Sequence, residues 1–153
     1  MFMKFLLSKC KLWLFLIILF VIWSSGLAKF DNIYVQPLIA FGCAYSGTRV
    51  RFEDSIHLML IVPFLAAMLN AVEIVGVVAF FMMLVFFAYR PLKKIKIFII
   101  GFLLFSALEF VSAIRYISLQ TIFMAAFYNT LIFMVMRKLC EIWFPSSQRN
   151  IFI

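Results

Sequence analysis

The most unusual residue of this chain is a glutamate inside an apolar segment. Glu109 lies within the apolar stretch 97–114, and an ionised acidic side chain in the hydrocarbon of a membrane costs about 2.5–3.5 kcal/mol. Asn70, Glu73 and Arg115 fall at the ends of apolar stretches. If these stretches are helices that cross the membrane, the three residues lie at the same side of the membrane, close to the depth of Glu109. We predict that these four residues form a polar cluster that closes one end of a helix bundle. Two interpretations would explain a glutamate at this position. It is either paired with other side chains of the protein, which we favour, or it is part of a ligand-binding or proton-binding site.

A second group surrounds the single histidine. His57 follows Asp54 by three residues and Glu53 by four, so one helical turn brings the three side chains together. They could form a proton relay, but we favour a solvated helix start, where acidic side chains are stabilised.

The remaining reactive residue types form no recognisable catalytic or metal-binding arrangement. No serine, threonine or cysteine is placed with a base as an activated nucleophile, and the five glycines form no phosphate loop. One histidine and no CxxC pair exclude the common zinc sites. We therefore expect no enzymatic activity, no cofactor and no metal. The cysteines are expected to be reduced apolar fillers: Cys10, Cys43 and Cys140.

The amino-acid composition indicates that the chain is a membrane protein. The 153 residues are 67% hydrophobic and 13% charged, with 21 phenylalanines, which is more apolar surface than a soluble domain of this size can bury. The net charge of +8 comes from residues between apolar runs. This pattern excludes a nucleic-acid-binding groove and suits contact with the headgroups of the lipid bilayer.

The apolar runs predict an all-α integral membrane protein with one membrane domain over residues 1–153. Each span needs about 20 residues and tolerates about 17, so we expect a compact bundle of six short transmembrane helices. The predicted spans cover residues 12–28, 33–47, 55–70, 73–89, 97–114 and 118–136.

The positive charges predict the orientation of this bundle. With the N-terminus inside, twelve of the fourteen Lys and Arg residues fall on the cytoplasmic side, and only Lys29 and Arg115 fall outside. Short cytoplasmic loops carry such an excess of positive charge, so we expect a bacterial inner membrane protein with both termini in the cytoplasm. The alternative for the first run is a signal peptide cleaved near Ala28, which would leave five spans.

Small and polar residues recur every four positions in the last predicted span, at Thr121, Ala125 and Asn129. This spacing lets helices approach closely and hydrogen-bond across their contact. The face either packs inside the bundle, which we favour, or binds another membrane protein.

A set of residues in a fixed order runs through the predicted spans: Pro37, Gly47, Asn70, Gly76, Ala79, Asn129, the run 131–136, Arg137 and Lys138. This order resembles the bacterial rod shape-determining protein family MreD over roughly residues 33–139. The resemblance implies a non-enzymatic inner-membrane scaffold of the cell-wall elongation complex. Its partners would be the periplasmic scaffold MreC and, through it, the actin-like filament, the glycan polymerase and the transpeptidase.

Two other functions fit the same pattern. The chain is similar in outline to the substrate-binding membrane subunit of an energy-coupling vitamin transporter, in which Glu73, Glu109 and Arg115 would surround the mouth of a ligand pocket. An immunity or exclusion protein against a pore-forming toxin is the third reading.

Overall fold

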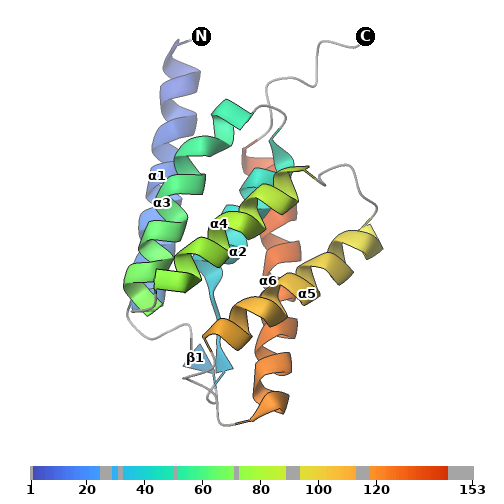
Figure 1. The fold of residues 1–153 in the computed structure, drawn as a ribbon. Coiled ribbons are helices and arrows are strands. Elements are labelled where there is room, and N and C mark those ends of the chain that lie inside the picture. The colour runs from blue at the N-terminus through green and yellow to red at the C-terminus, as the bar shows by residue number, and fades with distance from the viewer. Residues whose placement is uncertain are drawn as a thin grey trace.

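The computed structural model describes residues 2–24, 29–30, 33–49, 52–70, 73–88, 94–112 and 118–144. These residues form six helices and one short β-hairpin (Figure 1), which confirms the all-α class. The elements are α1 (Phe2–Ser24), β1 (Lys29–Phe30), β2 (Ile33–Tyr34), α2 (Pro37–Thr48), α3 (Phe52–Asn70), α4 (Glu73–Ala88), α5 (Lys94–Val111) and α6 (Leu119–Trp143).

The largest differences from the expected boundaries lie at both ends of the chain and before α2. α1 begins at Phe2 and α6 continues past Arg137, where Arg137 pairs with Glu141 one turn later at 3.8 Å. The second expected segment starts at residue 33, but residues 33–34 pair antiparallel with residues 29–30. α2 begins at Pro37, because proline lacks the N–H that a first helical residue does not need.

The helices alternate in direction along the chain. The starts of α1, α3 and α5 lie toward the same end of the bundle as the last turns of α2, α4 and α6 (Figure 1). The short helix α2 is the centre of the bundle, because it packs against α1, α3, α4 and α6. All its residues from Pro37 to Ser46 are buried. The close approach of α3 to α2 requires a small residue on α2. A Cβ added to Gly42 would lie 2.9 Å from Cγ1 of Val62.

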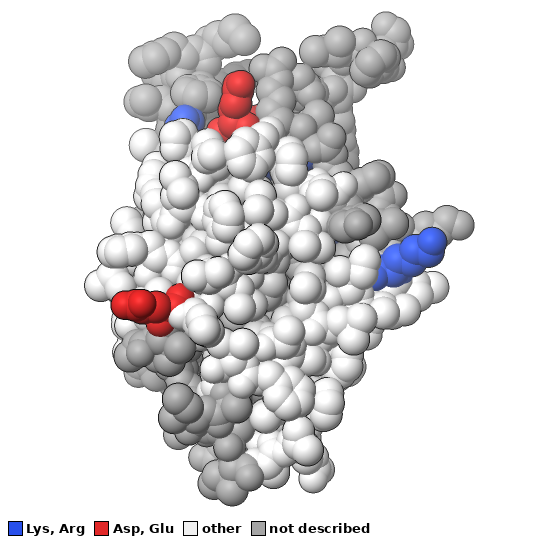
Figure 2. Space-filling view, viewed as in Figure 1, with Lys and Arg blue, Asp and Glu red and all other residues white. Residues whose placement is uncertain are grey.

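The outer surface of the described helices is apolar. Exposed side chains include Leu14 on α1, Phe64 on α3, Leu103 on α5 and Val135 on α6. Figure 2 shows a face on which uncharged atoms cover most of the surface, with the charged side chains near its edges. Among the described residues, the stretches Phe52–Leu69 and Leu119–Trp143 are long and apolar enough to cross a membrane. Such a surface suits a helix bundle that faces lipid.

We predict that Gly76→Ala will destabilise the contact between α3 and α4. The added Cβ would lie 2.8 Å from the carbonyl oxygen of Pro63 and 3.0 Å from Cβ of Ala67. Overpacking of this kind costs about 1–3 kcal/mol, so the midpoint of thermal unfolding in detergent should fall. The matched control is Gly47→Ala, whose Cβ would come no closer than 3.6 Å to its neighbours. Equal midpoints for the two variants would contradict the close packing.

Candidate functional site

Glu109 is completely buried near the end of α5. Its Oε1 accepts hydrogen bonds from Nε2 of Gln36, at 2.9 Å, and from Nδ2 of Asn129, also at 2.9 Å. Gln36 immediately precedes α2 and Asn129 lies in α6. The carboxylate therefore joins three segments that are far apart in the sequence.

A third hydrogen bond closes this group into a ring. The backbone N–H of Gln36 donates to Oδ1 of Asn129 at 2.7 Å. Asn129 and Glu109 are 0% exposed and Gln36 is 1% exposed. We call Gln36, Glu109 and Asn129 the polar triad. A buried polar group costs free energy unless it is hydrogen-bonded. The triad satisfies Oε1 of Glu109, the side-chain amide of Asn129, the amide nitrogen of Gln36 and the backbone N–H of Gln36, whereas Oε1 of Gln36 is buried with no hydrogen-bond partner among the described residues.

The predicted four-residue cluster is only partly described. Glu73 is exposed in the first turn of α4, whereas Glu109 is completely buried. A carboxylate in a first turn is stabilised by the helix dipole and by solvent, so Glu73 needs no buried partner. The side chain of Asn70 and all of Arg115 lie outside the described residues. The described group around Glu109 is formed by Gln36 and Asn129 instead.

The residues of the predicted α6 face point mainly into the bundle. Ala125 and Asn129 are completely buried. Thr121 is half-buried, and its hydroxyl donates to the backbone oxygen of Ser118 at 2.6 Å. Asn129 and Ala125 therefore contribute to internal packing, and Thr121 contributes to the N-terminal cap of α6.

Gln36 is the member of the triad that the sequence analysis did not identify as a site residue. The sequence feature that could have identified Gln36 is its long polar side chain directly before Pro37, at the start of an apolar segment. Its importance depends on two partners that lie 73 and 93 residues away. The packing of both α2 and α5 against α6 brings them together.

The other reactive side chains do not join the triad. Glu53, Asp54 and His57 are exposed at the start of α3, as expected for a solvated helix start. All three cysteines are free, with Cys43 and Cys140 buried and Cys10 exposed. Within the described ranges, no three metal-ligating side chains gather into a site.

A separate polar contact holds α2 and α6 together at their last turns. The buried Arg49 guanidinium donates from Nη2 to the backbone oxygen of Phe144. It also lies over the Tyr45 ring, 4.2 Å from the centroid. A cation on an aromatic face gains about 0.5–2 kcal/mol. Polar contacts therefore fix α2 to α6 near both ends of α2.

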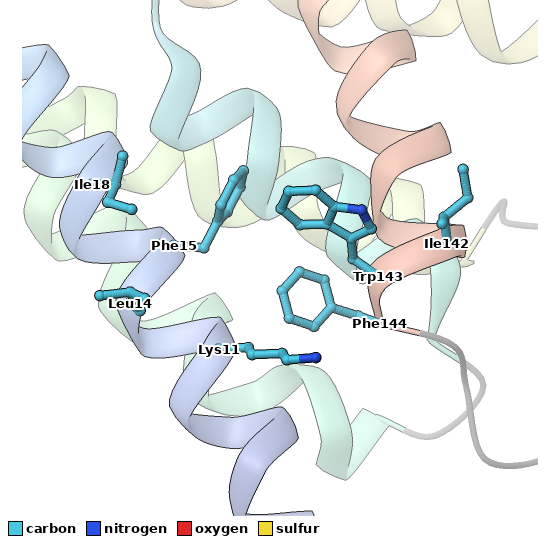
Figure 3. A pocket seen from close by; sticks show the side chains of 7 residues that line it. All are labelled: Lys11, Leu14, Phe15, Ile18, Ile142, Trp143 and Phe144. Atoms are coloured by element: carbon cyan, nitrogen blue, oxygen red, sulfur yellow. The ribbon is translucent and has the colours of Figure 1, made fainter.

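Two hollows on the described surface lie away from Glu109. One, of about 460 Å³, lies between α1 and the end of α6, and its lining residues are shown in Figure 3. The other, of about 320 Å³, lies between α3 and α4 beside Glu73. The triad lines neither of them. Its arrangement therefore suits a structural tie between helices better than a binding site.

Comparison with protein-family models, with curated proteins and with solved structures finds no match to this chain.

We predict that Glu109→Ala will destabilise the bundle. The substitution removes the acceptor of two buried amide groups, and each donor left without an acceptor costs about 1–3 kcal/mol. The free energy of unfolding in detergent, measured by titration with a denaturing detergent, should fall accordingly. Glu109→Gln keeps an oxygen acceptor and should retain most of the stability.

The matched control is Ser106→Ala on the same helix, because Ser106 donates only to the backbone oxygen of Phe102 within α5. It should change the free energy of unfolding little. If Glu109→Ala unfolds at the same detergent concentration as Ser106→Ala, the triad does not stabilise the bundle.

Proposed function

We propose that the protein is a multi-pass protein of the bacterial inner membrane, with six spans and both termini in the cytoplasm. The apolar outer surface and the two helices long enough to cross a membrane support this placement. The alternation of helix direction (Figure 1) supports it as well. Lys9 and Lys11 lie in the first half of α1, Lys94 and Lys96 in the first turn of α5, and Arg49 directly after α2. They therefore lie toward the end at which α1 and α5 begin and α2 ends (Figure 1), which suits the cytoplasmic side.

The short helix α2 is compatible with a complete crossing. Its 12 residues span about 18 Å at roughly 1.5 Å each. The non-helical residues 33–36 that precede it add at most about 13 Å at roughly 3.3 Å each, which brings the total close to the ~30 Å of hydrocarbon. Non-helical backbone at membrane depth must be buried in protein. Gln36 meets this condition, because its N–H is bonded to Asn129.

Within this membrane, we propose a non-enzymatic scaffold that resembles MreD and helps to organise the cell-wall elongation complex. The observation that carries the proposal is that nearly all described residues belong to helices that expose many large apolar side chains, with exposed charged residues concentrated in a few turns. A partner would therefore be met through helix contacts in the bilayer. The sequence resemblance over residues 33–139 supplies the identity of that partner, a periplasmic scaffold like MreC.

The buried position of Glu109 bears on the transporter alternative. A substrate-binding subunit would present the carboxylate to a ligand pocket. Glu109 is completely buried and hydrogen-bonded to two amides, and it lines neither of the two hollows. These contacts favour the scaffold over the transporter subunit.

Depletion of the protein from its rod-shaped host cell tests the scaffold. We expect the cells to become round as wall elongation loses its organisation, measured as the length-to-width ratio by microscopy. Expression of the Gly47→Ala variant should restore rods, because that substitution meets no close neighbour. Depleted cells that stay rod-shaped would contradict the proposal, and killing of such cells only by a pore-forming toxin would favour the immunity function.

A further inference from the structure

A groove lies between α1 and the end of α6, with a volume of about 460 Å³. This volume is within the range of roughly 300–1,000 Å³ that is typical of small-molecule sites. Within the described part of the chain, all the residues that line it are apolar or aromatic except one lysine (Figure 3). They are Lys11, Leu14, Phe15, Ile18, Ile142, Trp143 and Phe144.

The groove exists because two helices flank a third. α1 and α6 both pack against α2, and the groove runs between them. Its inner wall is aromatic: the Phe15 ring lies 4.8 Å from Phe41 of α2, 6.1 Å from Trp143 and 6.4 Å from Phe144, measured between centroids. An aromatic wall of this kind offers a large apolar contact area to an alkyl chain.

The α6 side of the groove is held in place. Arg49 donates a hydrogen bond to the backbone oxygen of Phe144, and the Phe144 side chain is buried. Its ring also packs against Tyr45 and Phe41, with centroids 6.0 and 6.3 Å away. A wall fixed before binding lowers the ordering cost of a ligand.

Lys11 supplies the only charge among the described residues that line the groove. Its side chain is exposed and extends from α1 toward the end of α6, beside the Phe144 ring (Figure 3). The groove therefore combines an apolar slot with an ammonium group that lies in the first half of α1 and beside the end of α6. Basic pockets between helices at a membrane surface bind the headgroups of anionic lipids.

We propose that this groove binds an anionic phospholipid. One acyl chain lies along Leu14, Phe15 and Ile18 against the aromatic wall, and the phosphate pairs with the ammonium group of Lys11. This inference rests on the proposed membrane placement and is independent of the scaffold role. The occupant is a lipid because the charge of Lys11 complements a phosphate, and because lipid meets every apolar surface open to the bilayer.

Tryptophan fluorescence with brominated lipids tests the proposal. Trp143 lines the groove, while Trp13 is an exposed residue of α1 that does not line it. Trp13→Phe with Trp23→Phe leaves Trp143 as the reporter, and Trp143→Phe with Trp23→Phe leaves Trp13 as the matched control. Both proteins are placed in phosphatidylcholine bilayers that contain increasing fractions of brominated phosphatidylglycerol or brominated phosphatidylcholine.

We expect brominated phosphatidylglycerol to quench Trp143 at a roughly fivefold lower mole fraction than brominated phosphatidylcholine, as expected for about 1 kcal/mol per lysine. Trp13 should be quenched equally by both lipids. Lys11→Gln should abolish the preference at Trp143, whereas Lys94→Gln, which removes an exposed charge from α5, should leave it unchanged.

Equal quenching of Trp143 by the two lipids would overturn the lipid site while leaving the membrane placement intact. Quenching of Trp13 without quenching of Trp143 would show that a protein segment fills the groove. Absence of quenching at both positions would contradict the membrane placement itself.

Native mass spectrometry of the unaltered protein gives a second measurement that needs no substitution. The protein is released from micelles that contain equal amounts of phosphatidylglycerol and phosphatidylcholine. Adducts with phosphatidylglycerol should persist at higher collision energy, and equal retention of the two lipids would overturn the proposal.

Discussion

The cost of placing a polar or charged group in an apolar medium constrains this bundle more than any other factor. Glu109 meets the constraint by accepting hydrogen bonds from Gln36 and Asn129. Arg49 meets it at the opposite end of α2 by bonding to Phe144 and lying over Tyr45. The same few contacts that satisfy these groups also join α2 to α5 and α6. The side chains that provide hydrogen bonds to the buried polar groups are therefore the same side chains that hold the helices together.

The central helix shows how the constraint shapes the fold. α2 is short and nearly all its residues are buried, so its packing depends on small residues such as Gly42, which lies against Val62. Pro37 is the first residue of the helix and is preceded by non-helical backbone at Gln36. That non-helical backbone is acceptable in an apolar interior because Asn129 accepts the N–H of Gln36. The outer helices then cover α2 and present their apolar sides outward.

The sequence predicted each of the six helical segments, because each is an apolar run between polar or charged residues. The prediction was less accurate at helix boundaries, because local features set them. Pro37 sets the start of α2, and the ion pair between Arg137 and Glu141 accompanies the longer α6. Glu109 was identified because a carboxylate is anomalous in such a run. Its partner Gln36 was not, because their contact spans 73 residues and follows from packing rather than from spacing. The groove beside Lys11 was missed for the same reason.

Cysteine labelling in whole cells tests most directly whether the cost of moving charge into the bilayer orients this chain. Lys94→Cys and Ser118→Cys, made after replacement of the native cysteines by alanine, place single thiols at exposed sites at the start of α5 and directly before α6. The proposed orientation puts these two sites on opposite sides of the membrane. A membrane-impermeant maleimide added to cells with a permeable outer membrane should modify Ser118→Cys. It should modify Lys94→Cys only after the inner membrane is also permeabilised. Modification of Lys94→Cys in cells with an intact inner membrane would contradict the proposed orientation.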